Sequence, residues 1–170
     1  MCGSGRSSLI FQKGFVQIEH LFISPGHNYF GHHGKPPGEH RIIEVQQVEC
    51  VAGKGIMDDR FFGFKEDYKG QITFFSYEVY DDLCHQLQVF NKSPAAFRRN
   101  AVIRGTDLSK FIGQRFTLQG VEFEGTEECR PCSWMDQAFA PGAETLLKGR
   151  GGLRARILTS GTIQLARHDV

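Results

Sequence analysis

The segment Cys129-Arg130-Pro131-Cys132 contains the residue types and spacing with the most chemical potential in the chain. Cys132 directly precedes Ser133, where we expect a short helix to begin, and N–H groups at a helix N-terminus favour a thiolate. A thiolate beside an arginine serves either as a ligand for a soft or high-valent metal or as a nucleophile in sulfur transfer. A thioredoxin-like redox pair is one alternative, since the segment lies between a predicted strand and a predicted helix. The other is that Cys129 is a small core residue, so that only Cys132 has a role or neither cysteine does.

A structural zinc site is not expected from these cysteines. Such a site needs four ligands, usually from two CxxC pairs, and this sequence has a single pair. Cys50 and Cys84-His85 would complete it only by a coincidence of folding. Four histidines lie in the Gly- and Pro-rich segment 24–40, at a spacing that fits no helix or strand face: His27, His32, His33 and His40. We interpret this segment as a long exposed loop that could cover a substrate, not as a metal site.

Arginines lie beside turn-prone backbone at two further places, Arg98-Arg99-Asn100 and the segment from Arg150 to Arg156. The forked guanidinium group matches phosphate oxygens in pairs, and glycine-rich turns can present backbone N–H groups to an anion. Arg99 and Arg150 are therefore candidates for phosphate binding. Strand periodicity places Arg156 on a solvent-facing side, and we interpret it as a surface residue.

The chain is expected to form one domain over residues 14–170, preceded by a flexible leader at residues 1–13. Its 170 residues include 20 Gly and 15 Phe, which favours short strands joined by tight turns. One helix is predicted to begin at Ser76, with an apolar face that extends to Phe90. A short helical turn is capped by Asp107 or Thr106 and ends at Gly113, and a third helix begins at Ser133 with a Ser133…Asp136 capping pattern. The predicted strands are 15–23, 41–51, 72–75, 101–104, the hairpin 115–118 with 121–124, and the hairpin 153–159 with 162–166. This pattern predicts a mainly β protein, a closed or partly closed β-barrel with a few short helices.

Composition and net charge limit the partners and the cellular location that we expect. A formal net charge of +1 gives no bulk attraction to nucleic acid. No apolar run approaches the ~20 residues that span a bilayer, and the N-terminus has no signal-peptide core. We therefore expect no membrane partner and a cytoplasmic, reducing location, in which the five cysteines are thiols.

Taken together, the segments resemble the MOSC family, whose domain forms the C-terminus of molybdenum cofactor sulfurases and has relatives in the mitochondrial amidoxime-reducing proteins. The resemblance extends over about residues 14–166 and suggests a stand-alone member without a fused cysteine desulfurase. The motifs that carry it follow the family's order: Gly55-Ile56-Met57-Asp58-Asp59-Arg60, Arg98 to Leu108, Phe111 to Phe116, Gly125 to Cys132, and Gly149 to Ile157.

The resemblance implies a pyruvate-kinase-like β-barrel whose cleft holds the molybdenum cofactor, a molybdopterin. It implies that Cys132 ligates molybdenum or carries sulfur. The positions that it implies for cofactor binding are Asp59, Arg60, Arg99, Asn100, Thr126, Arg150, Gly151 and Arg154. In one departure, Asp58 stands where the family has a glycine, and Asp tolerates a positive φ less well than glycine. In another, Cys129 supplies a second thiol, for which a disulfide or a persulfide relay with Cys132 is one interpretation and no role is the other.

Three functions are consistent with these residues. The first is a molybdenum cofactor-binding protein that reduces N-hydroxylated substrates at a Cys132-ligated metal, with electrons from a separate reductase. The second is a non-redox carrier of cofactor or sulfur, in which Cys132 holds a persulfide received from a cysteine desulfurase. The third is a zinc- or phosphate-binding module that shares only the barrel. No lysine lies in a recognisable pyridoxal phosphate site, so we do not expect that cofactor.

Overall fold

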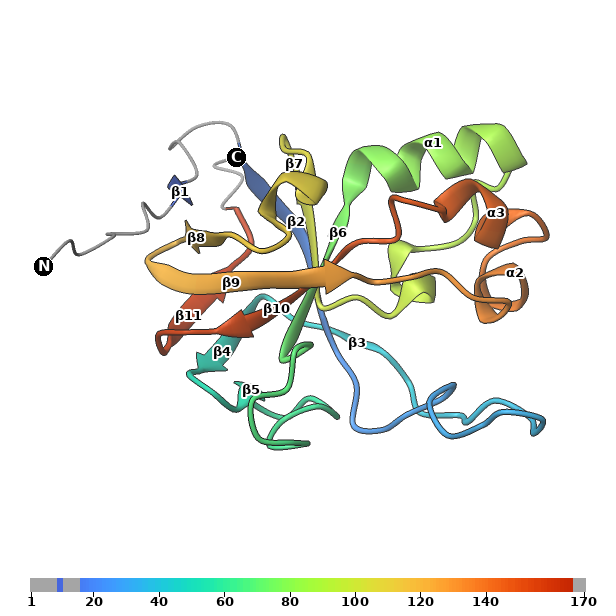
Figure 1. Ribbon diagram of the computed structural model, residues 1–170. Helices are drawn as coiled ribbons and strands as arrows, with labels where there is room; N and C mark the ends of the chain where they lie inside the picture. Colours follow the sequence, from blue (N-terminus) through green and yellow to red (C-terminus); the bar gives the residue numbers. More distant parts are fainter. Residues whose placement is uncertain (1–8, 11–15, 167–170) are drawn as a thin grey trace, which may run out of the picture.

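The computed structural model describes residues 9–10 and 16–166 and shows a mainly β protein with a few short helices (Figure 1). The larger sheet contains β1 (Leu9–Ile10), β8 (Arg115–Leu118), β9 (Val121–Glu128), β10 (Leu153–Ile157), β6 (Ile72–Ser76), β7 (Ala101–Arg104), β2 (Gln17–Ile23) and β3 (Ile43–Glu44), in that order. The smaller sheet contains β11 (Gly161–Gln164), β4 (Gln47–Val51) and β5 (Gly55–Ile56). The helices are α1 (Tyr77–Leu87), α2 (Trp134–Ala138) and α3 (Ala143–Leu147), with 3₁₀ turns η1 (Pro94–Phe97) and η2 (Leu108–Phe111).

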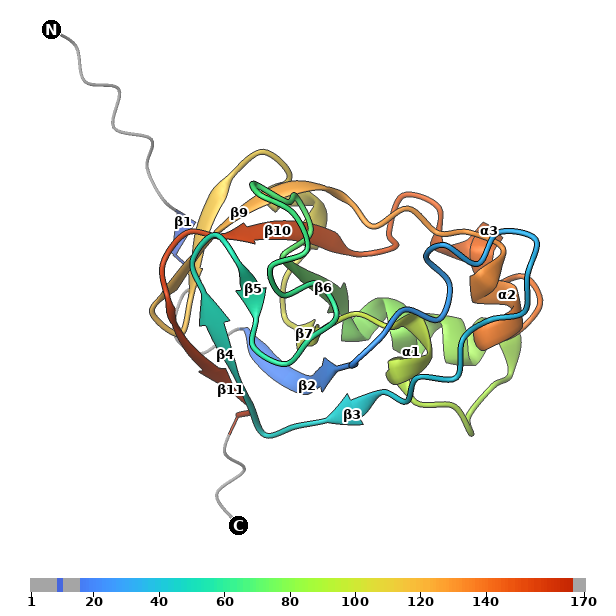
Figure 2. The ribbon, with the colours of Figure 1, turned by 90° about the horizontal axis from the view of Figure 1, so that it is seen from below.

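The predicted β-barrel is not confirmed, although the mainly β class with few helices is. The hydrogen-bonded order of the larger sheet runs from β1 to β3, and no pairing between described strands joins these two ends. The sheet is mixed, because β1 pairs with β8 and β6 pairs with β7 in parallel, while its other pairs are antiparallel. Figure 2 shows the strands of the smaller sheet facing those of the larger one across a shared interior.

The main hydrophobic core fills this interior and explains why the two sheets pack together. Val48 and Ile163 of the smaller sheet belong to the same buried cluster as three phenylalanines of the larger sheet. Phe74 lies 5.6 Å from Phe116 and 5.4 Å from Phe123, measured between ring centroids, and the three rings are fully buried. Burial of aromatic side chains of this size stabilises the domain in proportion to the apolar area removed from water.

A second core lies under the helices and fixes the end of the molecule where the candidate site is found. As predicted, Ser76 caps α1, and its Oγ accepts a hydrogen bond from the backbone N–H of Val79 at 3.3 Å. The predicted apolar face is too long, since α1 ends at Leu87 and Phe90 is 65% exposed. The predicted capping pattern Ser133…Asp136 is also wrong. Ser133 makes no cap bond, and Asp136 accepts instead from the N–H of Glu144 in α3.

The two predicted hairpins have opposite outcomes. The first is confirmed: β8 and β9 are joined by Gln119-Gly120, both with positive φ, as two-residue hairpins require. The second, between residues 153–159 and 162–166, is wrong. Both edges of β10 are occupied, by β6 and by β9. The chain therefore passes to the smaller sheet at Ser160, where β11 pairs with β4. The predicted strand 41–51 is likewise divided into β3 and β4, which belong to different sheets.

The ends of the chain are described only in part. Leu9 and Ile10, inside the predicted leader, pair in parallel with β8. Residues 1–8 and 11–15, which make up the rest of that leader and the start of the predicted domain, lie outside the described residues, as do residues 167–170. In the part of the chain that the structure describes, no helix is long and apolar enough to cross a membrane.

Candidate functional site

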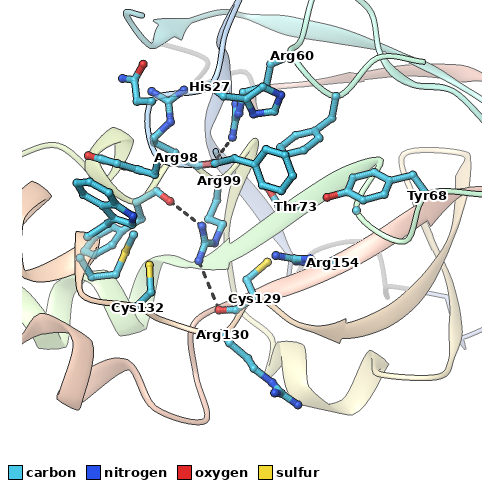
Figure 3. Close-up of a pocket in the computed structure, with 18 of the residues that line it drawn as sticks. His27, Arg60, Tyr68, Thr73, Arg98, Arg99, Cys129, Arg130, Cys132 and Arg154 are labelled. Carbon is cyan, nitrogen blue, oxygen red and sulfur yellow. Dashed lines mark hydrogen bonds between the residues drawn. The ribbon is translucent and has the colours of Figure 1, made fainter. Parts of the chain in front are cut away.

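One cavity of ≈ 360 Å³ brings together residues from five separate segments of the chain (Figure 3). The loop after β2 contributes His27 and Tyr29 among others, and the segment between β5 and β6 contributes Arg60, Phe61 and Tyr68. The remaining lining residues come mainly from positions 97–99 and 129–135, with Arg154 from β10. Cys132, the predicted reactive thiol, is exposed and lines this cavity.

The lining is strongly cationic. Among the described residues it includes no Asp or Glu and five arginines: Arg60, Arg98, Arg99, Arg130 and Arg154. Burial lowers the pKa of Arg98 to about 10, with a further contribution from the nearby charge of Arg60. Both groups still carry their protons at neutral pH. A concave surface with charges of one sign concentrates counter-ions, so the cavity is suited to an anion.

Arg99 is held by backbone carbonyl groups. It donates from Nη1 to Phe97 at 2.8 Å, from Nε to Gly151 at 3.2 Å and from Nη2 to Cys129 at 3.4 Å. Within the described residues no carboxylate forms an ion pair with Arg99 or Arg98. Neutral acceptors orient the side chain but leave its positive charge uncancelled, so the charge remains available to a ligand.

Arg98 anchors the histidine-containing loop, a role that the sequence did not reveal. Its Nη2 donates to the Ser24 hydroxyl at 3.0 Å and to the carbonyl of Gly26 at 2.7 Å, and Nη1 donates to the carbonyl of His40 at 3.4 Å. Arg98 itself has φ 54°, a left-handed conformation that is uncommon for a residue other than glycine. The start and end of the loop 24–40 are therefore fixed to one buried guanidinium group.

The turn from Gly55 to Arg60 is built around a buried carboxylate. Asp58 has φ 64°, so it adopts the left-handed conformation that glycine favours, in spite of its side chain. Asp59 accepts hydrogen bonds from the backbone N–H of Ser24 at 3.1 Å and of Phe61 at 3.2 Å. It also pairs with Arg60 Nη1 at 3.3 Å. Asp59 thus positions Arg60, and Arg60 is the member of the pair that lines the cavity.

Two predicted binding residues act behind the cavity wall. Asn100 is buried, and its Oδ1 accepts from both the N–H and the hydroxyl of Thr73, at 3.0 and 2.9 Å. Thr126 donates its hydroxyl hydrogen to the carbonyls of Lys69, at 2.7 Å, and Arg154, at 3.1 Å. Neither residue lines the cavity, but Thr73 and Arg154, which they hold, do so.

Arg150 and Gly151 are not brought to this cavity. Arg150 pairs with Asp82 at 2.7 Å and lines a separate cavity beside the start of α1. The N–H of Gly151 donates to the Glu128 carboxylate at 3.1 Å and is not free for an anion. A Cβ at Gly151 would overlap the carbonyl oxygen of Cys129, so glycine here permits a close approach of two backbone segments.

The two cysteines of the CxxC segment differ in access. Cys129 is buried, and burial raises the pKa of its thiol, although the charges of Arg99 and Arg154 act in the opposite direction. Cys132 is exposed, and its carbonyl oxygen accepts from the N–H of Met135 at the start of α2. In the part of the chain that the structure describes, the cysteines form no disulfide, and no three His, Cys, Asp or Glu side chains are placed to hold a metal ion.

An aromatic wall around the cavity was not predicted. His27 meets the ring of Phe61 edge-on at 4.8 Å, and Phe61 stacks on Tyr68 at 5.3 Å. On the other side Tyr29 stacks on Trp134 at 4.9 Å. The aromatic residues at positions 61–68 were the available signal, yet their sequence does not show which ring faces a cavity.

Comparison with known proteins gives a family and a fold. The model of the MOSC domain family matches residues 31–166. The chain is similar in structure to the YuaD protein from Bacillus subtilis, with a TM-score of 0.69 at 17% identity, covering 88% of this chain and 91% of that one. It is also similar to YiiM from Geobacillus stearothermophilus, with a TM-score of 0.62 at 15% identity, covering 91% and 77%. YiiM from Escherichia coli gives a TM-score of 0.56 at 15% identity, covering 88% and 70%. A search of curated proteins gives no significant match.

Proposed function

The chain belongs to the MOSC domain family, and on this premise we propose that it binds the molybdenum cofactor with Cys132 as the thiolate ligand of the metal. The single observation that carries the proposal is that Cys132 is exposed in a cavity whose described lining has five arginines and no carboxylate. A thiolate is a soft ligand, and guanidinium groups bind phosphate oxygens. The side chains present therefore fit a group that joins a metal to an anionic organic ligand.

The chain's own residues divide the work of binding. Arg99 and Arg154 supply charge from the side of the cavity where Cys129 is buried, and Arg60 supplies it from the opposite loop. The stacked pair of Tyr29 and Trp134 offers an aromatic surface to a planar ring. Behind the cavity wall, the carboxylate of Asp59 holds Arg60, and the amide of Asn100 holds Thr73.

The reaction that we propose is the reduction of N-hydroxylated compounds. The cofactor, when bound, supplies the two-electron chemistry that removes oxygen from nitrogen, with electrons from a separate reductase. The chain ligates the metal through Cys132 and neutralises the cofactor's phosphate. Its loop 24–40 limits the access of water to the cavity. This loop is attached at both ends to Arg98, which keeps His27 and Tyr29 at the cavity.

Metal analysis tests this function. The full chain is purified from a host that makes the molybdenum cofactor and from one that does not, and molybdenum is measured by mass spectrometry of the elements. We expect stoichiometric molybdenum only in protein from the first host. Cys132→Ser should lose most of it, and Cys84→Ser, which changes a buried thiol in α1, should retain it. Equal metal in Cys132→Ser and wild type would contradict thiolate ligation.

A sulfur carrier is the second candidate, and the same exposure of Cys132 favours it. In that function Cys132 would accept a sulfur atom from a cysteine desulfurase and hold it as a persulfide. Incubation with a desulfurase and cysteine, followed by intact-mass measurement, tests this alternative. No added sulfur on Cys132 would exclude the carrier function, and a zinc-binding module would instead be identified by zinc in the elemental analysis.

A further inference from the structure

Tyr68 places a phenolic hydroxyl in the same cavity, and neither the sequence motifs nor the proposed ligation by Cys132 gives it a role. It lies in the segment between β5 and β6 and lines the cavity together with Thr73 and Arg154. Figure 3 shows the hydroxyl directed into the cavity, on the side where Thr73 and Arg154 lie. The role of this hydroxyl depends on the atom that accepts its hydrogen bond.

The ring of Tyr68 is held in one orientation. It stacks on Phe61 with centroids 5.3 Å apart and an interplanar angle of 22°, and it meets Phe64 edge-on at 5.0 Å. A Cβ at Gly70 would come within 3.2 Å of the ring, so the backbone there closes the third side. These contacts orient the ring and, with it, the hydroxyl.

Among the described residues, no atom accepts a hydrogen bond from this hydroxyl. None of the hydrogen bonds among the described residues involves it, whereas Tyr80 donates its hydroxyl to the carbonyl of Lys92 at 2.8 Å. A half-buried tyrosine hydroxyl ordinarily finds a partner. Burial raises the pKa of Tyr68, while the charge of Arg154 acts in the opposite direction, so the phenol keeps its proton at neutral pH and remains a donor.

The groups around Tyr68 indicate which kind of atom can accept a hydrogen bond from its hydroxyl. The nearest charged side chains of the cavity wall are cationic, and Arg154 uses Nη1 to pair with Glu127 at 3.2 Å outside the lining. Cations cannot accept a hydrogen bond, and in the part of the chain that the structure describes no carboxylate lines the cavity to do so. An anionic oxygen of a ligand is the acceptor that satisfies both the phenol and the neighbouring guanidinium groups.

We propose that Tyr68 is a ligand-binding residue whose hydroxyl donates a hydrogen bond to a tetrahedral oxyanion held beside Arg154. Phosphate, either free or as the phosphate group of a cofactor, is the representative of this chemistry. The assignment of the oxyanion to the molybdenum cofactor rests on the proposed function. The contact between Tyr68 and an oxyanion does not, so the two claims are tested separately.

The test uses the full chain from a host without cofactor synthesis, labelled with ¹³C at the ring Cζ of tyrosine. The chain has four tyrosines, so the spectrum has few signals, and each is assigned with a Tyr→Phe variant. Titration with inorganic phosphate should shift the Tyr68 signal with saturation and leave Tyr77 and Tyr80, which lie outside the cavity, unshifted. By calorimetry, Tyr68→Phe should bind phosphate about tenfold more weakly, because a hydrogen bond to a charged group is lost.

Tyr77→Phe is the matched control, because it removes a phenolic hydroxyl outside the cavity and should bind phosphate like wild type. Tyr68→Phe keeps the ring that stacks on Phe61, and an unchanged thermal midpoint establishes that it is folded. The proposal is overturned if Tyr68→Phe binds phosphate as tightly as wild type. It is also overturned if the wild-type chain binds no phosphate or binds it without a shift of the Tyr68 signal.

A second arm identifies the source of the oxyanion. Wild type and Tyr68→Phe are prepared from a cofactor-producing host and their molybdenum content is compared. Reduced molybdenum in Tyr68→Phe, together with weaker phosphate binding, assigns the contact to the phosphate group of the cofactor. Unchanged molybdenum with weaker phosphate binding supports the contact and assigns it to free phosphate. Absence of molybdenum from wild type would contradict the proposed function and leave the phosphate result on Tyr68 standing.

Discussion

The guanidinium group of Arg99 donates from Nε to the carbonyl oxygen of Gly151 at 3.2 Å. Two further bonds from the same side chain reach the carbonyls of Phe97 and Cys129. One arginine therefore links three backbone segments by hydrogen bonds: the turn before β7, the residue directly after β9, and the loop before β10. These three backbone segments form the wall that carries Cys132, so Arg99 serves the site by geometry as well as by charge.

Replacing Arg99 with lysine separates these two contributions. Arg99→Lys keeps the positive charge, but a single ammonium group cannot reach all three carbonyls, and their desolvation is left uncompensated. We expect the free energy of unfolding, measured with urea, to fall by about 1–3 kcal/mol. Arg130→Lys, at an exposed position in the same lining, should change it little. Equal stability of the two variants would show that the three bonds are energetically unimportant.

The left-handed residue Asp58 provides a test of the turn that holds Asp59. Its φ of 64° is accessible to glycine without a steric penalty and is poorly accessible to a β-branched residue. We expect Asp58→Gly to change the free energy of unfolding by less than about 1 kcal/mol, and Asp58→Val to lower it by about 1–2 kcal/mol. Thermal denaturation of both variants measures this difference. A Val variant as stable as the Gly variant would argue against the left-handed turn.

His27 gives the fold a dependence on pH with a definite sign. Burial, and then the charges of Arg60 and Arg98, lower its pKa from the ordinary value of 6.5. The unfolded chain therefore takes up a proton at a higher pH than the folded chain does. This contribution to stability is fully present above pH 6.5 and is lost as the pH falls from 6.5 through the folded-state pKa.

Urea unfolding of wild type and His27→Gln at several pH values between neutral and mildly acid conditions measures this effect. The wild-type chain should lose more stability than His27→Gln as the pH falls. His33→Gln, which changes an exposed histidine of the same loop, is the control and should follow wild type. Parallel stability curves for wild type and His27→Gln would contradict the assignment to His27.

The two thiols of the CxxC segment should differ in their rates of alkylation. Cys132 is exposed, whereas burial limits access to Cys129 and raises the pKa of its thiol. Iodoacetamide at neutral pH should therefore modify Cys132 first, with Cys129 protected until the chain unfolds. Peptide mapping by mass spectrometry over a time course measures both sites. If Cys129 is modified as fast as Cys132, the backbone segments that bury Cys129 must open in solution.

Local features, such as a helix cap and a hairpin turn, were predictable from the sequence, whereas the pairing of strands that are distant in the chain was not. The Ser76 cap and the Gln119-Gly120 hairpin follow from rules that involve a few neighbouring residues. The partner of β11 depends on which strand edges remain free after β6 and β9 have paired with β10, and alternation of apolar residues does not contain that information. The closed or partly closed barrel was predicted from many short strands joined by tight turns, a pattern that does not specify which strand edges pair, and it is not confirmed.

The candidate site shows the same limit at the level of single residues. Motif matching located Cys132, Arg99 and Arg154, which the fold brings to one cavity. It also selected Arg150, only four positions before Arg154, which pairs with Asp82 and faces another cavity. A motif specifies position along the chain, but the direction of a side chain depends on contacts such as this ion pair. No motif singles out Arg98, although it adjoins Arg99, because its loop contacts are 58 to 74 residues away in sequence.

The central claim is that Cys132 ligates molybdenum in the arginine-lined cavity, and X-ray absorption at the molybdenum edge tests it most directly. Wild type and Cys132→Ser are each loaded with excess cofactor, and the number of sulfur atoms bound to the metal is measured. Our account predicts one sulfur ligand fewer in Cys132→Ser than in wild type. The same number of sulfur ligands in both proteins would contradict it.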